Sequence, residues 1–455
     1  MSLSSLLSIA RSALLTHRRA MDVTAHNVAN AQTPGYSRQR LRLAANPPIA
    51  AHAGWIGTGV TDQGVMRTRD RLLDAGYRRE SGLLGRSSTM QNYLDQIEAA
   101  VGEPTEGGLS STLDAMFQSF SDLANDPSNP VRRDLVRTAA GRFSRQLSEL
   151  AGRVLNATQN AVDQLRGQVA EVNTISGRIA DLNAQIVAVS ATGQDATDLA
   201  DQRDVLVDQL SSYMSVRVVE QKDGGIAVIA GETTLVDGAN SQTLLVRGVS
   251  GGGYGIGVTG SGGTIDPQGG SLKGLSELTT TTLPGFMRQL NQLAAAIVGE
   301  VNAVHQSGFT LSGATGVDFF DPTGVTALTI GLSADVRASS DAIAAAGTAA
   351  PGDAAIALQL AQLGGSGVAG LGGRTFREFY VRFAADVGTQ SRNSALDVEG
   401  QQTLVDRSDS MRLSVSGVSI DEEMVILIDQ QEAYSAAARL IQVAQEMMDD
   451  VMRMV

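Results

Sequence analysis

Both ends of the chain carry apolar residues at intervals of seven. Near the N-terminus the stripe follows Leu3 and consists of Leu7, Leu14, Met21 and Val28. Near the C-terminus it begins beside Met424 and consists of Leu427, Tyr434, Ile441, Met448 and Val455. A stripe this narrow is typical of a helix that packs on a partner helix rather than on a broad core. We therefore predict that these residues form an assembly interface.

The two terminal segments also carry opposite charge. The first 45 residues contain six arginines and a single acidic residue, Asp22, whereas residues 415–455 contain eight acidic residues and two arginines. Narrow stripes of opposite charge favour packing of one end on the other. We expect residues 1–60 and 412–455 to form one terminal coiled-coil domain. Two independent surface helices are the alternative.

Between these ends the pattern is helical over long stretches. Apolar residues at spacings of three, four and seven predict a helix from about 131 to 190, which is too long for a lone globular helix. Further helical segments are expected at about 63–100, 109–124, 195–212, 284–305 and 374–411. The economical packing is a long-helix bundle domain built from residues 61–212 and 284–411.

Residues 213–283 break the helical pattern. From Val216 onward apolar and polar residues alternate, and Asp223-Gly224 supplies the turn of a β-hairpin. The following residues are rich in glycine, and a second irregular stretch at 306–352 is typical of loops with short strands. The predicted fold class is therefore mainly α, with an inserted β-rich outer domain at 213–283.

Composition narrows the classes of function. The net charge of -13 disfavours nucleic acid as a partner, because phosphate binding needs a basic face. Cysteine is absent, which removes thiolate nucleophiles, thiolate zinc sites and disulfides. No run of eighteen apolar residues occurs, so membrane insertion is not expected. The N-terminal segment lacks the pattern of a cleaved secretory signal.

No catalytic constellation emerges from the motifs. The Gly-x-Gly-x-x-Gly string at 255–260 lacks a following helix and is interpreted as β-turn glycine. The acidic run 421–423 after Ser419 fits a helix start with carboxylates near the positive end of the helix dipole. Ligand spacing is missing among the four histidines, which are His17, His26, His52 and His305. We expect no enzyme activity, no cofactor and no metal site.

A turn motif follows the first helix. Pro34 biases Thr33 away from helix and Gly35 permits a turn, so the helix is predicted to end near Ala31. The run NVANAQTPGYSRQ, residues 27–39, resembles the signature of bacterial flagellar axial proteins, and residues 416–455 resemble their matching terminal helix. The motif positions that carry the resemblance are Asn27, Asn30, Pro34, Gly35 and Tyr36.

Internal segments resemble one group of axial proteins, the hook-associated proteins of the hook–filament junction (FlgK family). The resemblance lies in 198–238, in SDLANDPSNPVRRDLV from Ser121 and in TFREFYVRFAADVG from Thr375. One departure is Ala354, where the family usually has Asn after a Gly-Asp pair. The inserted β region is also short for the family.

The resemblance implies a structural subunit that polymerises at the junction and connects hook to filament. Its implied partners are further copies of itself, the hook protein, a second junction protein on the filament side, and an export chaperone that binds the C-terminal helix. It also implies export through the flagellar type III apparatus to the cell exterior, with terminal helices that fold on assembly. Another axial subunit, such as a hook or distal rod protein, is the alternative. An adhesin or an enzyme grafted into 213–283 is a more distant one.

Overall fold

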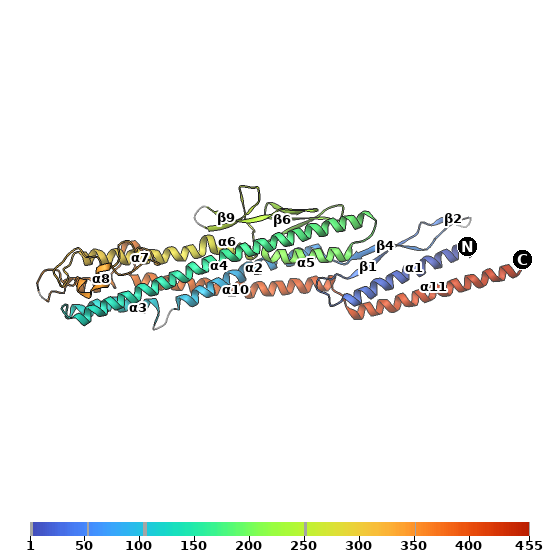
Figure 1. The fold of residues 1–455 in the computed structure, drawn as a ribbon. Coiled ribbons are helices and arrows are strands. Elements are labelled where there is room, and N and C mark those ends of the chain that lie inside the picture. The colour runs from blue at the N-terminus through green and yellow to red at the C-terminus, as the bar shows by residue number, and fades with distance from the viewer. Residues whose placement is uncertain (1–2, 52–53, 103–106, 250–252, 351, 455) are drawn as a thin grey trace.

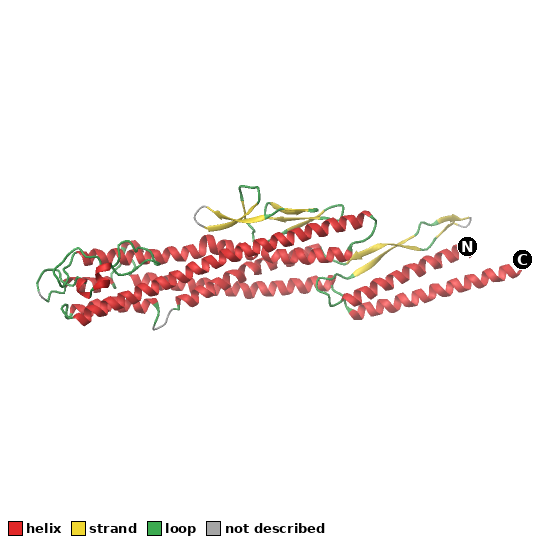
Figure 2. Ribbon diagram, in the orientation of Figure 1, coloured by secondary structure: helices red, strands yellow, loops and turns green. Residues whose placement is uncertain are grey.

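The computed structural model describes residues 3–51, 54–102, 107–249, 253–350 and 352–454. The molecule is elongated, and a long helical body continues at one end into a thinner pair of terminal helices (Figure 1). Helices form most of the chain, while strands lie along the body and beside the terminal helices (Figure 2). The predicted fold class, long helices with a small β-rich part, is confirmed.

The terminal pair consists of α1 (Leu3–Asn30) and α11 (Ile420–Met454). The two helices lie side by side and antiparallel, so that both termini point away from the body (Figure 1). The two ends thus pack on each other, as their opposite charges predict.

The body is a bundle whose longest member is α4 (Pro130–Ala191), with 62 residues. Its start is determined locally, because Pro130 suits the first helical turn and the Asn129 side chain accepts from the amide of Val131. One face of α4 is buried over its whole length, from Val136 to Ile186. The long helix predicted at 131–190 is confirmed. The other main helices of the body are α2 (Arg71–Val101), α3 (Leu109–Ala124), α5 (Thr197–Tyr213), α6 (Gly270–Glu277), α7 (Leu283–Gln306), α9 (Ala355–Leu363) and α10 (Phe376–Ser416).

The end of the body far from the termini is irregular. Among the described residues between α7 and α10, the elements besides α9 are short, namely α8 (Ala334–Ala338), η2 (Ser340–Ala342) and η3 (Ala369–Leu371). Strand pairing among the described residues 307–350 is limited to isolated bridges, such as Phe309 with Ala346. The loops predicted at 306–352 are present, but the predicted short strands are reduced to isolated bridges in the described part of this stretch, which packs through side chains such as Phe319 and Phe320.

Two small antiparallel sheets lie along α4. The strands are β5 (Arg217–Glu220), β6 (Ile226–Ala230), β7 (Thr233–Asp237) and β8 (Asn240–Ser241) in one sheet, and β9 (Leu244–Val249), β10 (Gly253–Val258) and β11 (Thr264–Ile265) in the other. Gly224 has a φ of 91° in the turn that joins β5 to β6, so the predicted hairpin is confirmed. Residues 270–282 are helical instead, and run from α6 through the π-helical turn η1 (Leu278–Thr282) into α7.

Asparagine side chains of α4 fasten these sheets to the body. Asn173 donates to the carbonyl of Leu244 and accepts from its amide at 2.9 and 2.7 Å. Asn183 is fully buried and makes the same pair of bonds with Ile226. Since an amide side chain both donates and accepts, one residue can continue the hydrogen-bonding edge of a strand.

A narrow β arm, which the sequence analysis did not predict, runs along α1. β1 (Gln39–Ala45) pairs with β4 (Val60–Arg67), and β2 (Ile49–Ala51) pairs with β3 (Gly54–Ile56) towards the tip. The helix predicted from residue 63 was wrong at its start, because residues 60–67 pair as a strand. The helix α2 begins only at Arg71, where the Asp70 side chain accepts from the amide of Leu72 at 2.8 Å.

Candidate functional site

The predicted seam residues lie on the terminal pair with unequal burial. Leu3, Leu7, Leu14, Met21 and Val28 of α1 are all half-buried, as are Leu427 and Ile441 of α11. By contrast, Met424, Tyr434 and Met448 are 44 %, 36 % and 42 % exposed. Val455 lies outside the described residues. Part of the predicted stripe therefore faces solvent in the single chain.

Small and polar side chains form the contact line of α11 instead. Its buried residues are Glu423, Ala437 and Ala444, and Gln430 continues their spacing of seven through a 2.7 Å hydrogen bond to His17 of α1. Each residue of this contact line comes one position before a residue of the seven-residue series that contains Met424. Small side chains let the two helices approach closely, which leaves the larger apolar residues outside. The seven-residue spacing of Ala437 and Ala444 is present in the sequence, but the prediction of the interface rested on the larger apolar residues instead.

The motif at 27–36 forms a compact turn that closes α1. The helix ends at Asn30, one residue from the prediction, and Gly35 has a φ of 80°. A Cβ on Gly35 would lie 2.1 Å from the Val205 side chain of α5, so the turn also needs glycine for close approach. Asn30 donates to the carbonyl of His26 and accepts from the Thr33 hydroxyl.

Asn27 is the centre of this turn. It is buried, and its Oδ1 accepts from the Gln39 amide at 2.9 Å and from the Tyr36 hydroxyl at 2.8 Å. Its Nδ2 donates to the Gln39 carbonyl and to Oε2 of Glu423, both at 2.9 Å. The hydrogen-bonding capacity of Asn27 is thus used to join α1, β1 and α11.

Glu423 is a buried residue of this site whose role the sequence analysis did not predict. Its residue exposure is 1 %, and its Oε1 accepts from Nε of Arg38 at 2.7 Å. Arg38 also bonds Glu422 at 3.0 Å. The acidic run after Ser419 was interpreted as a helix start, and the Glu422 amide does lie 3.4 Å from the Ser419 hydroxyl. Only the fold reveals that Glu423 turns inward to a buried arginine.

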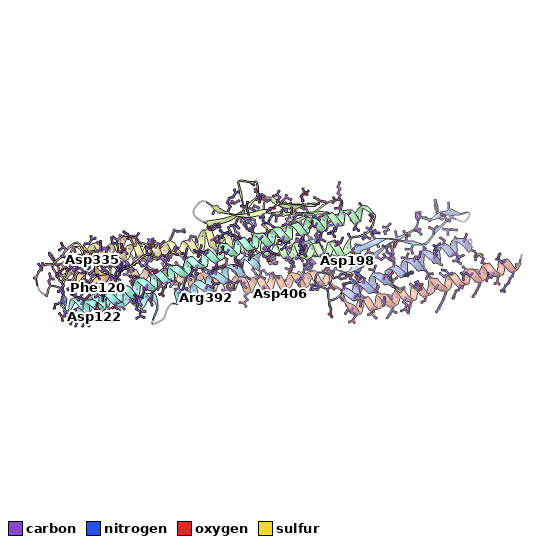
Figure 3. All side chains as sticks on the ribbon, in the orientation of Figure 1. Phe120, Asp122, Asp198, Asp335, Arg392 and Asp406 are labelled. Carbon is purple, nitrogen blue, oxygen red and sulfur yellow. The ribbon has the colours of Figure 1, made fainter. Side chains whose placement is uncertain are left out.

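The same turn is fastened to the body through α5. The Ser37 amide and hydroxyl both donate to Asp201, at 3.0 and 2.7 Å, and Gln39 donates to Asp198 at 2.7 Å. Burial raises the pKa of Tyr36, and the nearby carboxylates add to this effect. Tyr36 therefore acts as a neutral hydrogen-bond donor. Asp198 lies at the end of the body that faces the terminal pair, far from Phe120 at the other end (Figure 3).

Behind the turn, arginines and aspartates form a buried ionic network. Arg67 donates to Asp201 at 2.8 Å and to Asp204 at 2.6 Å. Burial alone would raise the pKa of Asp204, but the guanidinium groups of Arg69, Arg67 and Arg78 lower it. Arg412 of α10 reaches Asp208 and stacks over the Tyr77 ring at 4.0 Å. We use the name "polar joint" for Asn27, Tyr36, Ser37, Arg38, Arg67, Arg69, Arg78, Asp201, Asp204, Asp208, Arg412 and Glu423.

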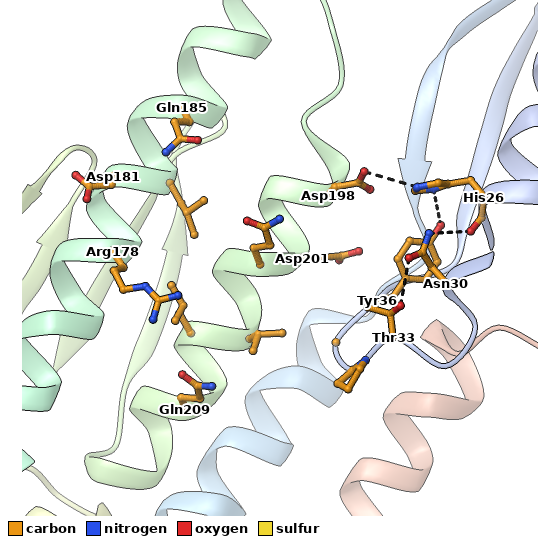
Figure 4. Close-up of a pocket in the computed structure, with 16 residues that line it drawn as sticks. His26, Asn30, Thr33, Tyr36, Arg178, Asp181, Gln185, Asp198, Asp201 and Gln209 are labelled. Atoms are coloured by element: carbon orange, nitrogen blue, oxygen red, sulfur yellow. Dashed lines mark hydrogen bonds and ion pairs between the residues drawn. The ribbon is translucent and has the colours of Figure 1, made fainter. Parts of the chain in front are cut away.

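A groove of about 680 Å³ is lined by the turn, α5 and α4. His26, Tyr36 and Asp198 lie on one side of it, and Arg178 and Asp181 lie across from them (Figure 4). His26 is 3.1 Å from the Tyr36 hydroxyl and 3.8 Å from Asp198. Because its pKa is raised, the Tyr36 hydroxyl stays protonated, and it stabilises the turn through its hydrogen bonds to Asn27 and His26.

The described residues offer neither a cluster of metal ligands nor a membrane-spanning helix. Groups of three or more His, Asp or Glu suited to a metal ion are not found among them. Within the described ranges, each helix is also too short or too polar to cross a membrane.

Three protein-family models match the chain. "Flagellar hook-associated protein FlgK helical domain" matches residues 94–320. "Flagella basal body rod protein" matches residues 7–36, and "Flagellar basal body rod FlgEFG protein C-terminal" matches residues 410–454. The two terminal matches cover most of α1 with its turn and all of α11, and the internal one covers most of the helical body.

Individual proteins extend this similarity over nearly the whole chain. "Flagellar hook-associated protein 1" of Bacillus subtilis is 30 % identical, and the match covers 98 % of this chain and 97 % of that protein. The protein of the same name from Salmonella typhimurium is 30 % identical over 70 % of this chain, and the match spans only 59 % of its length. The solved structure of the flagellar hook junction protein FlgK from Burkholderia pseudomallei has a TM-score of 0.64 and 19 % identity, and covers 76 % of this chain and 100 % of that one.

Proposed function

The chain belongs to the family of flagellar hook-associated protein 1, and we propose that it polymerises at the hook–filament junction as a structural subunit that connects hook to filament. The observation that carries this proposal is the combination of terminal segments similar to rod proteins with an internal FlgK helical domain. A hook or distal rod protein is the alternative, and the internal match at 94–320 argues against it.

The open face of α11 supports self-assembly. Apolar side chains along it are 40 % to 60 % exposed, and include Val425, Ile428, Leu440, Val443, Met447 and Val451. An exposed set of apolar side chains of this kind marks a protein interaction surface. In the proposed assembly, the terminal coiled-coil domain of residues 1–60 and 412–455 lies innermost, and neighbouring copies cover this face. The bundle domain and the β-rich part at 213–283 lie further out.

Charges on the terminal pair support contacts between copies as well. Arg11 and Arg18 of α1 have no ion-pair partner among the described residues, nor have Glu432 and Asp449 of α11. Basic and acidic faces of different copies can then meet, which directs the association. The hook protein and a second junction protein are the proposed neighbours at the two ends of the assembly.

Delivery to this place requires a route out of the cell. The chain is proposed to leave unfolded through the flagellar type III apparatus, with an export chaperone on the C-terminal helix. Coupling of terminal folding to assembly fits this route, because a helix of about thirty residues with a narrow stripe is marginal in water by itself.

Gene deletion in the host tests the assignment. We expect hooks to form without filaments, and flagellin to be lost to the medium. Expression of the intact chain from a plasmid should restore filaments. Filaments of normal length on the deleted cells would contradict the proposal, and loss of the hooks themselves would favour the alternative of a hook or rod subunit.

A further inference from the structure

A second cavity, of about 420 Å³, lies beside the polar joint and has a strongly basic wall. It is bordered by the end of β4, the start of α2, α5 and the strands β5 and β6. Its wall contains three carboxylates, Asp74, Asp204 and Glu220, against six arginines, which are Arg67, Arg69, Arg71, Arg78, Arg203 and Arg217. This local excess of positive charge contrasts with the net charge of -13 of the whole chain.

The three carboxylates of the wall are already engaged. The guanidinium of Arg69 donates to both carboxylate oxygens of Asp74, at 2.7 and 3.0 Å, and to Asp204 at 2.9 Å. Asp204 also accepts from Arg67 at 2.6 Å. Glu220 pairs with the exposed Arg71 at the rim. These pairs leave Arg203 and Arg217 without a carboxylate.

Arg203 is the clearest sign that the cavity takes a ligand. It is only 5 % exposed, and its Nη1 donates to the Asn183 side chain and the Gly224 carbonyl, both at 2.9 Å. Its Nε is buried and has no acceptor in the described part of the chain, and no ion pair with a carboxylate is formed there. Burial lowers its pKa, and the charges of Arg67 and Arg78 act in the same direction, while the carboxylates of Asp204 and Glu220 oppose them in part. A buried guanidinium beside other guanidinium groups is stabilised by an anion.

We propose that this cavity binds a small, multiply charged oxyanion of the phosphate class, with Arg203 as the buried anchor and Arg217 at the rim. A guanidinium presents its donors in a planar fork that matches two oxygens of such an ion, which chloride cannot offer. Nucleic acid is a poor candidate, because the acidic surface repels a long polyanion while a small ion can enter. The proposal does not depend on the flagellar role.

Bound oxyanion would tie the β-rich part to the polar joint. Arg203 lies on α5, and Arg217 is on β5. An ion shared by the two would add contacts across the boundary between helices and strands. The folded state should therefore be stabilised according to the concentration of the ion relative to its dissociation constant.

Thermal unfolding and titration calorimetry of the intact chain test this inference. Inorganic phosphate is compared with chloride at constant ionic strength and pH. We expect a saturable rise in Tm with phosphate, and one calorimetric site per chain. Arg217→Gln should weaken phosphate binding at least about tenfold, the equivalent of about 1.4 kcal/mol, and Arg203→Gln should abolish it.

The matched control is Arg178→Gln, an exposed arginine on α4 that lines the other groove and should bind phosphate normally. Because Arg217 is exposed, its variant should fold even if Arg203→Gln does not. Stabilisation that never saturates, or is equal in the Arg217 and Arg178 variants, would reflect general salt effects and overturn the proposal. Absence of a calorimetric site in the unaltered chain would overturn it too.

Discussion

His305 is a buried histidine in the body with both ring nitrogens in use. Its Nδ1 lies 2.6 Å from the Val317 carbonyl, and its Nε2 accepts from the Ala344 amide at 2.7 Å. This arrangement fits a neutral ring that carries its proton on Nδ1. Burial lowers its pKa to about 4, and nearby Arg133 acts in the same direction, while the Val317 bond and Asp318 oppose them.

This shift predicts a loss of stability in mild acid. Between pH 6.5 and about 4 the unfolded chain binds a proton at this position and the folded chain does not, so the free energy of unfolding falls as pH falls. The contribution is roughly 3 kcal/mol across that range. Urea unfolding at pH 7, 5.5 and 4.5 should show a flatter profile for His305→Gln. His17→Gln on the terminal pair is the control, and equal slopes in all three proteins would refute the assignment.

Glu423 supports a second prediction, concerning the polar joint. Glu423→Gln removes the charge that pairs with Arg38, and breaking one side of a buried pair costs about 3–5 kcal/mol. We expect the amount of subunit retained on hooks to fall at least about tenfold in a complemented deletion strain. Asp421→Asn is the matched control, because Asp421 is an exposed acid on the same turn. Equal retention of the two variants would show that the Glu423–Arg38 pair does not orient the terminal helices.

At the scale of elements, α1 and α11 differ from the helices of the body. They project beyond the bundle, and only three residues of α11 are buried. Ordering each backbone residue costs about 1–2 kcal/mol of conformational entropy, which a pair with so little buried apolar area does not offset. The terminal pair of a free subunit should therefore be largely unfolded, although the body is not.

Brief proteolysis of the free subunit measures this difference. Trypsin should cut first at Arg11, Arg18, Arg439 and Arg453, and leave a resistant fragment of about residues 60–410. Cutting at Arg19 and Arg38 should accompany it, since both lie on the N-terminal segment that loosens and the partner of Arg38, Glu423, lies on the C-terminal one. A chaperone on the C-terminal helix should protect Arg439 and Arg453. Resistance at these sites equal to that of buried Arg133 would count against folding on assembly.

At the scale of the whole molecule, the body and the terminal pair have separate tasks. The body has its own core, which extends from Tyr93 to Val387 and includes no residue of α1 or α11. It should fold without them. The terminal pair is attached mainly through the polar joint, whose strength comes from hydrogen bonds and ion pairs.

Removal of residues 425–455 tests whether folding of the body and assembly through the terminal pair are independent. The shortened chain should keep the cooperative thermal transition of the body but fail to join hook to filament, because the apolar face of α11 is gone. A full-length chain with Val443→Asp should show the same defect, since it places a charge within that face. Circular dichroism measures the thermal transition of each variant, and electron microscopy shows whether hooks are joined to filaments. Normal junctions with the shortened chain would refute the role of α11.

The sequence by itself determined the elements that depend on neighbours along the chain. The spacing of Leu147, Val154 and Leu165 predicts the helix α4, and Asp223-Gly224 predicts the hairpin of β5 and β6. Both predictions succeed because periodicity and turn chemistry are local properties. The resemblance of residues 27–39 and 416–455 to flagellar axial proteins was also apparent from the sequence without the structure.

Only the tertiary structure decided which faces meet. Ala437 and Ala444, not the larger apolar residues beside them, lie against α1, because small side chains permit the closest helix approach. The pairing of Glu423 with Arg38 joins residues 385 positions apart, and the basic cavity gathers arginines from four segments. No local sequence pattern encodes these long-range contacts, since they depend on how the long helices bring distant segments to one end of the body.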